Sequence, residues 1–216
     1  MTAPSGLAWP PDHPAELARI PSAALPLRLH RLSHWTSPWW FSSAGAGDQG
    51  GRFHLPTPHG TCYLAENLEG ALLEKVLRRS RRIVAAEQLT GLFHVKVAVV
   101  TPPPTANLTA AAVTGLGVNA EISTGLDYAK PRAWAAALHR AGWYAVRYAL
   151  RGDSSLRQRG VALFGRAGLH RRAPAGFRTS LTTLDPVEAA ALLERRGVGV
   201  HPIPLARDLP LVPPSG

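Results

Sequence analysis

The sequence predicts a single α+β domain in which short strands are mixed with a few flanking helices. Segments with apolar residues at every second position are interspersed with segments of helical periodicity. The 216 residues, 45% of them hydrophobic, suit one domain with a substantial core. Because the sequence shows no internal repeat, it does not favour a solenoid or a propeller.

We divide the chain into an arm at residues 1–24, which is rich in proline and alanine and predicted to be loose, a domain at 25–208 and a tail at 209–216. No apolar run approaches the ~18 residues that a membrane-spanning helix needs. The N-terminal residues show no basic region followed by an apolar stretch, so no secretory signal is visible. We therefore expect a cytoplasmic protein without a membrane partner.

The first strand is expected at residues 27–32. Leu27, Leu29 and Arg31 share one face of this strand, because side chains alternate along an extended backbone. If that face is the core face, Arg31 needs a carboxylate or a bound anion as partner. The alternative is an edge strand that leaves Arg31 in water.

An aromatic, irregular segment at residues 34–41 follows and is expected to be core, with a pocket cover as the alternative. A loop rich in glycine, serine and alanine at 42–51 leads to Arg52, and residues 61–65 predict a second strand.

The second strand leads into a predicted helix at residues 68–79. Asn67 is a suitable N-cap because its side chain can accept a hydrogen bond from a free backbone N–H. Glu74 lies close to the apolar side of this helix, which consists of Leu68, Leu72, Leu73 and Val76.

The second half of the chain continues the mixed pattern. Residues 105–128 give no clear prediction. Pro131 and Gly142 are typical of a helix start and a helix end, and Asp185 begins a sequence like a capping box. We predict strands at 92–100, 143–148, 160–164 and 198–203, and helices at 131–141 and 185–196.

The net charge of +10 comes from 24 Lys and Arg against 14 Asp and Glu. Such an excess suits nucleic acid, an acidic protein or a phosphate-bearing small molecule. The dense run at residues 78–82 lacks interleaved aromatics, so we interpret it as a solvated helix end. No motif for reading bases is present, and direct nucleic-acid binding ranks last.

Several kinds of site are disfavoured by spacing. Cys62 is the only cysteine, which excludes an intramolecular disulfide, and the nine histidines have no acidic or thiolate partners at ligand spacing. We therefore expect no metal. Residues 115–120 match G-x-G-x-x-A, but no acidic residue follows about 20 positions later to hold a ribose, so a flexible loop is expected. No G-x-S-x-G elbow is present.

A better candidate site combines Arg31, Arg52, Tyr63 and Glu74. Two arginines on or beside neighbouring strands can clamp a diphosphate through bidentate hydrogen bonds. The two glycines before Arg52 would let the backbone approach such a ligand closely. Tyr63 offers a flat face for a ring, and Glu74 can turn back towards the same cleft.

These residues resemble the RES domain family, whose pattern is a strand arginine, G-G-R-[FW], Y-L-A and a helical glutamate. The pattern reads here as Leu29-His-Arg31, Gly50-Gly-Arg52-Phe53, Tyr63-Leu-Ala65 and Ala71-Leu-Leu-Glu74. The later run at 142–148 and the strand at 161–164 are also similar. The resemblance covers about residues 26–165, most of the chain.

RES proteins are known as toxins of bacterial toxin–antitoxin pairs that break the bond between nicotinamide and ribose in NAD. Some use inorganic phosphate as acceptor, and at least one relative is described as an ADP-ribosyltransferase acting on a protein. The resemblance therefore implies an ADP-ribosyltransferase-like fold of mixed and antiparallel sheets with flanking helices. It also implies NAD as substrate without a further cofactor, phosphate as possible co-substrate, and an Xre-type helix-turn-helix antitoxin as partner.

The resemblance assigns catalysis to Arg52 and Glu74, and substrate binding to Arg31 and Tyr63. One departure concerns the serine of the family, which is replaced here by Leu150, next to Arg151. Ser154 and Ser155 lie close enough in sequence to substitute for it, and with Arg151 they complete the expected substrate-binding residues. The alternatives are an ADP-ribosyltransferase that modifies a protein and a nucleotide-binding module with weakened catalysis.

Overall fold

The computed structural model describes residues 6–45, 50–77 and 83–202. A 7-stranded sheet forms its centre. Neighbouring strands in this sheet are antiparallel except the last two, which are parallel. The order is β12 (Phe177–Thr183), β7 (Phe93–Val99), β1 (Arg28–Ser33), β5 (His59–Ala65), β10 (Arg159–Arg166), β9 (Ala145–Ala149) and β8 (Thr105–Asn107). The prediction of an α+β fold is confirmed.

Three two-stranded sheets lie beside the large one. They pair β2 (Trp39–Phe41) with β11 (Gly168–His170), β3 (Ser43–Ala44) with β4 (Leu55–Pro56), and β6 (Ile83–Ala85) with β13 (Gly199–His201).

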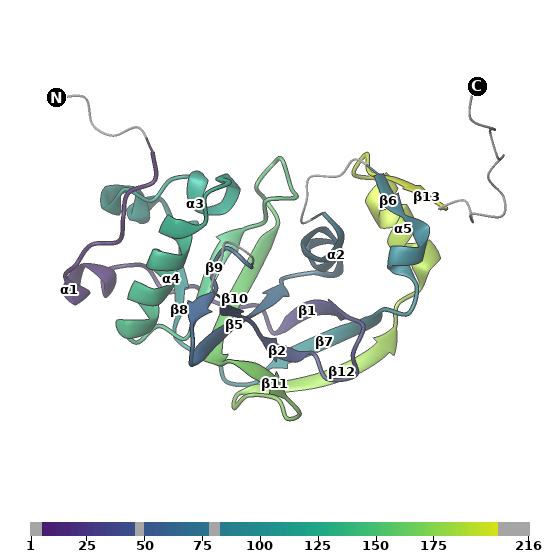
Figure 1. Ribbon diagram of the computed structural model, residues 1–216, viewed down its shortest axis with the longest axis horizontal. Helices are drawn as coiled ribbons and strands as arrows, with labels where there is room; N and C mark the ends of the chain where they lie inside the picture. Colours follow the sequence, from purple (N-terminus) through teal and green to yellow (C-terminus); the bar gives the residue numbers. More distant parts are fainter. Residues whose placement is uncertain (1–5, 46–49, 78–82, 203–216) are drawn as a thin grey trace, which may run out of the picture.

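The helices gather in three places around the sheet (Figure 1). At one end, beside β8 and β9, lie α4 (Ala129–Arg140), α3 (Glu121–Thr124) and α1 (Pro14–Leu17). The middle of the sheet carries α2 (Leu68–Val76), and α5 (Pro186–Glu194) lies at the other end with β6 and β13. Short 3-10 helices are η1 (Ala86–Leu89) and η2 (Ala111–Leu116).

Apolar side chains are buried on both faces of the sheet. The larger cluster lies under the helices and includes Phe53, Leu72 and Trp134. The smaller cluster lies on the other face, where Trp39 and Phe41 of β2 pack with Leu29 and Cys62. The expectation that the aromatic segment at 34–41 is core is therefore confirmed for Trp39 and Phe41, whereas Trp35 and Trp40 are exposed.

The predicted strands and helices are found within a few residues of their expected limits, and the Asp185 side chain caps α5 by accepting from Val187 N–H. Several strands were not predicted, and β12 is the longest of them. It lies at the sheet edge, where most of its side chains are exposed and polar, so it lacks an apolar alternation. The arginine run at 78–82, the predicted helix end at residue 79 and the tail at 209–216 lie outside the described residues.

The expectation of a loose N-terminal arm is wrong for the described residues of the arm. Leu7, Leu17 and Ile20 are buried in the larger core cluster. The indole N–H groups of Trp134 and Trp143 donate to backbone carbonyls of Ala8 and Leu17. The proline and alanine content that suggested a loose segment instead accompanies an irregular chain that packs through a few large apolar residues.

The sheet opens between β1 and β5. In the described chain, β1 pairs with β7 along its whole length, but its register with β5 consists of the single pair His30 and Ala65. Beyond this pair the two strands diverge, and α2 lies over the gap (Figure 1). This opening in an otherwise continuous sheet positions the candidate site.

Candidate functional site

A small pocket with a cavity volume of about 70 Å³ lies at the opening between β1 and β5. Residues of β1, β5 and α2 line it, and they include three of the predicted site residues, Arg31, Tyr63 and Glu74. Residues that are far apart in the sequence therefore line one pocket.

The position of Glu74 follows from the way α2 is built. Asn67 is the N-cap, as predicted, and its side-chain oxygen accepts from Gly70 N–H at 2.7 Å. Leu72 and Leu73 are buried in the core below the helix. Glu74, next along the helix, is half-buried and lines the pocket.

Arg31 lines the pocket. It follows His30, the one residue of β1 that pairs with β5 in the described chain. It is half-buried, and its Nη1 donates to Cys62 Sγ and more weakly to the Tyr63 carbonyl at 3.5 Å. The edge-strand alternative is wrong, since β1 is an interior strand. These protein partners of Arg31 are neutral, and a bound anion as its partner stays a prediction. Leu29 is fully buried as expected, but Leu27 lies before the strand and is 82% exposed.

Arg52 is 7% exposed, and its guanidinium is engaged by the protein itself. It donates to the carbonyls of Glu121 at 3.4 Å and Gly125 at 2.9 Å, and it lies 4.6 Å from the centre of the Tyr128 ring. Of the described residues, those that line the pocket do not include Arg52.

Arg52 nevertheless interacts electrostatically with Glu74. Burial lowers the pKa of the Arg52 guanidinium, and the charge of Arg151 lowers it further, whereas Tyr128, Tyr148 and Glu74 raise it. Arg52 is therefore a buried cation behind the pocket rather than an open clamp.

The glycines before Arg52 have a different role from the one expected. A Cβ on Gly51 would lie 2.4 Å from the Tyr63 hydroxyl, and a Cβ on Gly50 would lie 2.6 Å from the His54 ring. Gly50 also has a φ of 146°, which favours glycine. The two glycines make room for protein side chains, so the prediction that they admit a ligand is not supported by their contacts.

Tyr63 joins the G-G-R-F segment to β5. Its hydroxyl accepts from Phe53 N–H at 2.9 Å, and Thr61 donates to the Phe53 carbonyl at 2.7 Å. The Tyr63 ring meets the Tyr148 ring edge-on, with centres 6.4 Å apart. Tyr63 thus lines the pocket and also anchors the loop that carries Arg52.

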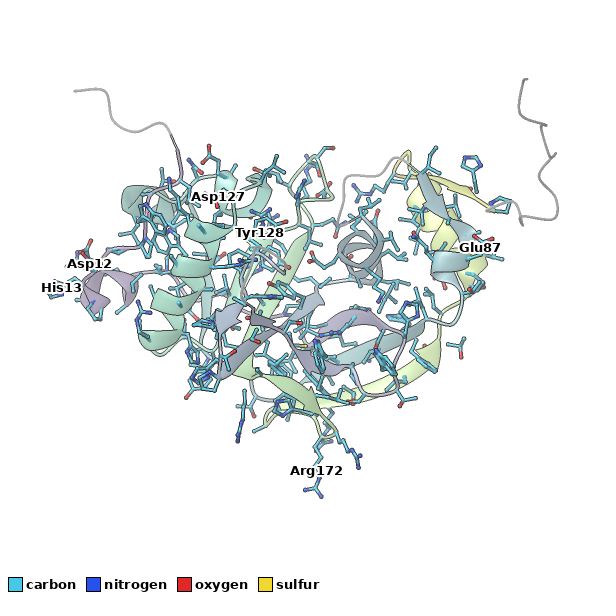
Figure 2. The ribbon with its side chains drawn as sticks, in the orientation of Figure 1. Asp12, His13, Glu87, Asp127, Tyr128 and Arg172 are labelled. Carbon is cyan, nitrogen blue, oxygen red and sulfur yellow. The ribbon has the colours of Figure 1, made fainter. Side chains whose placement is uncertain are left out.

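Two tyrosines belong to this site that sequence reasoning did not select. Tyr148 of β9 is buried, and its pKa is raised well above the ordinary value by burial first and then by the Glu74 carboxylate and Tyr63. Tyr128, at the start of α4, lies on the inner side of that helix (Figure 2) and also receives a hydrogen bond from Arg151 at 3.4 Å. Tyr148 was visible in the motif of the resemblance, but Tyr128 had no sequence signal.

The remaining predicted residues lie on the connection between β9 and β10. Arg151 is close to Arg52 and Tyr128, so it joins the site. Ser154 and Ser155 are exposed, and the Ser155 hydroxyl donates to Asp153 at 2.7 Å. Leu150, at the place of the family serine, is 0% exposed and packs between Gly70 and Gly160. The structure therefore gives no substitute for that serine in the pocket lining.

The described part of the chain holds no group of three or more His, Cys, Asp or Glu side chains placed to bind a metal ion. Its helices are also too short or too polar to span a membrane. The residues that line the pocket include the carboxylate of Glu74, the ring of Tyr63 and three basic residues, His30, Arg31 and Lys75. This set can bind an anion and can stabilise positive charge that develops on a ligand.

Known proteins resemble this chain in sequence family and in fold. The RES domain matches residues 25–183. The fold is similar to a chain in the crystal structure of the M. tuberculosis MbcT–MbcA toxin–antitoxin complex, with a TM-score of 0.56 and 16% identity, over 84% of this chain and 96% of that chain. No curated protein matches the sequence. Because the RES match covers most of the residues and contains every strand of the large sheet, this chain belongs to the RES domain family.

Proposed function

We propose that the protein cleaves NAD at the bond between nicotinamide and ribose. The observation that supports this best is the meeting of Arg31, Tyr63 and Glu74 in the pocket where β1 and β5 diverge. Glu74 also interacts with the charge of Arg52. The pocket thus combines a cation for phosphate oxygens, a ring for stacking and a carboxylate for the reacting carbon.

In this mechanism Arg31 binds the diphosphate, and Tyr63 packs against the nicotinamide or the ribose. Nicotinamide leaves with the electron pair of the glycosidic bond, and positive charge develops on the ribose ring. Glu74 stabilises that charge, and electrostatic stabilisation of this kind is worth about 3 kcal/mol or more. Phosphate or water then attacks the anomeric carbon.

Arg52 has a different role from the one that the sequence suggested. Because its guanidinium donates to two backbone carbonyls, we assign it the positioning of the site rather than direct contact with the diphosphate. Its positive charge interacts favourably with the Glu74 carboxylate.

We further propose that the protein acts as the toxin of a toxin–antitoxin pair. Membership of the RES family supports this, and so does the similar fold in the MbcT–MbcA complex. The proposed partner is an Xre-type antitoxin.

A second candidate is a nucleotide-binding module without turnover. Leu150 favours it, because a fully buried leucine takes the place of the family serine and offers no hydroxyl to a substrate. The loss of one such hydrogen bond costs about 1 kcal/mol, which weakens catalysis without abolishing binding.

The test is to incubate the purified protein with NAD, with and without inorganic phosphate, and to identify the products by mass. Release of nicotinamide supports the enzyme, and the mass of the other product distinguishes phosphate from water as acceptor. The Glu74→Gln variant should bind NAD similarly, but its kcat should be at least about 100-fold lower than that of the parent. Turnover of this variant at the parent rate would exclude Glu74, and tight NAD binding without nicotinamide release would support the binding module.

A further inference from the structure

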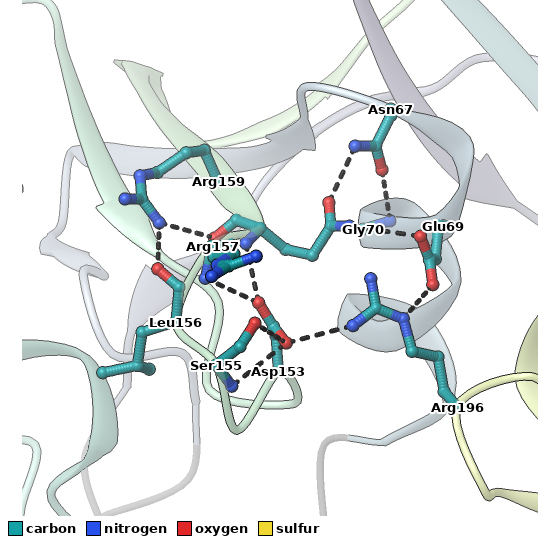
Figure 3. Close-up of polar contacts among 10 residues, drawn as sticks. Asn67, Glu69, Gly70, Asp153, Ser155, Leu156, Arg157, Arg159 and Arg196 are labelled. Carbon is teal, nitrogen blue, oxygen red and sulfur yellow. Dashed lines mark hydrogen bonds and ion pairs between the residues drawn. The ribbon is translucent and has the colours of Figure 1, made fainter.

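A polar network joins three segments around the site (Figure 3). The connection between β9 and β10 contributes Asp153, Ser155, Arg157 and Gln158, the start of α2 contributes Asn67 and Glu69, and the turn after α5 contributes Arg196. We call these residues the Asp153 network.

Asp153 organises the β9–β10 connection from within. It is 3% exposed, and its carboxylate accepts from the N–H groups of Arg157 and Gln158 at 2.7 Å each and from Ser155. Burial alone raises the pKa of Asp153, but these hydrogen bonds outweigh it and the pKa lies below its ordinary value. Leu156 has a φ of 51°, which is unusual for leucine, so the connection needs contacts of this kind.

Arg196 connects this carboxylate to α2. Its Nη1 lies 3.3 Å from Asp153 Oδ1, and its Nε donates to Glu69 Oε1. Gln158 adds a second link between the two segments, because its side chain donates to Glu69 at 3.1 Å and accepts from Asn67 at 2.7 Å. A guanidinium can bind two carboxylates in this way because its donors lie in one rigid plane.

The two segments that Arg196 joins both carry residues of the candidate site. Arg151 precedes Asp153 by two residues, and Glu74 follows Glu69 by five residues on the same helix. Arg196 itself lies beyond residues 25–183, the part that matches the RES domain. A residue from outside the family match therefore contacts both of these segments.

We propose that Arg196 is a positioning residue that holds α2, with Glu74, against the β9–β10 connection, with Arg151. This inference rests on the proposed function for its effect on turnover. Misplacement of a reacting group by about 1 Å can lower the rate roughly 100-fold, so even a small shift of Glu74 is measurable.

The test compares Arg196→Ala with Arg195→Ala, which removes the same charge from the exposed neighbouring residue. We expect kcat/KM for NAD, per folded molecule, to fall about tenfold in Arg196→Ala and to stay near the parent value in Arg195→Ala. Arg196→Lys should fall between them, because an ammonium cannot span both carboxylates as a planar fork does. If Arg196→Ala does not fold, Arg196→Lys serves for the same comparison.

Amide hydrogen exchange gives a readout that does not depend on turnover. Exchange at residues 153–158 and in the first turn of α2 should be severalfold faster in Arg196→Ala than in Arg195→Ala. Equal exchange in the two variants, or equal kcat/KM, would overturn the inference. If the parent releases no nicotinamide, the proposed function fails, and hydrogen exchange alone decides whether Arg196 holds the two segments together.

Discussion

At the scale of single residues, Arg52 shows how a site motif can serve packing. Its guanidinium is buried and donates to the carbonyls of Glu121 and Gly125, while Tyr128 covers one of its faces. The same side chain raises the electrostatic potential near Glu74. Structure and proposed chemistry therefore depend on the same residue.

We expect Arg52→Ala to lower the free energy of unfolding by roughly 2–4 kcal/mol, because two carbonyls lose a charged donor. Urea unfolding measures this, with Arg178→Ala on the exposed side of β12 as the control that should stay near the parent. A variant that unfolds at the parent urea concentration but needs much more NAD would contradict this role and restore Arg52 as a direct clamp.

The glycines and tyrosines show why residue roles were only partly predictable. The motif of the family resemblance selected Tyr63 and Glu74, and both residues line the pocket. The contacts that explain Gly51 come from Tyr63 and His54, and those of Tyr128 come from Arg52 and Arg151. Such contacts depend on where other segments lie, which no local pattern encodes.

At the scale of secondary-structure elements, the pair β1 and β7 contains a partly buried histidine contact. His30 Nδ1 and His94 Nε2 are 2.9 Å apart. The pKa of His30 is lowered from 6.5 to about 4, first by burial and then by His94, Lys96 and Arg28. The pKa of His94 is lowered in the same direction, first by burial and then by Lys96.

This contact predicts a pH dependence of stability. Between pH 6.5 and about 4 the unfolded chain binds a proton at His30 and the folded protein does not, so stability falls as the pH drops through this range. Because His30 is only half-buried, we expect a loss on the order of 1–2 kcal/mol after allowing for solvent screening.

Urea unfolding at pH 7 and pH 4.5 measures the effect. The His30→Gln variant should lose less stability between the two pH values than the parent. The His13→Gln variant, which changes an exposed histidine, should behave like the parent. If parent and His30→Gln show the same difference, His30 does not contribute.

At the scale of the whole molecule, the N-terminal segment is part of the domain. It supplies Leu7, Leu17 and Ile20 to the larger core. Its backbone carbonyls also accept hydrogen bonds from the indole N–H groups of two tryptophans. It also covers an edge of the large sheet, because Ala23 N–H donates to the Thr105 carbonyl of β8 at 2.8 Å.

Removal of residues 1–24 should therefore lower stability by roughly 4 kcal/mol or more, since each buried Leu or Ile is worth about 1.5–3 kcal/mol. For a chain of this size the expected drop in Tm is about 10 °C. Thermal unfolding of the shortened chain measures it, and an unchanged Tm would support a loose arm. Removing residues 203–216, which lie after β13, is a comparison from the other end of the chain.

By itself, the sequence determined the mixture of strands and helices and the cap of α2. It also determined that Glu74 lies in the helix that follows the strand of Tyr63. These features depend on neighbours along the chain, because side-chain alternation, helical periodicity and capping act over a few residues. The tertiary structure alone decided that β1 and β5 diverge to form the pocket, that Arg52 is buried behind it, and that Arg196 reaches the loop of Arg151. Those outcomes depend on how distant segments share space and pair their buried charges, and this is settled only when the whole chain is packed.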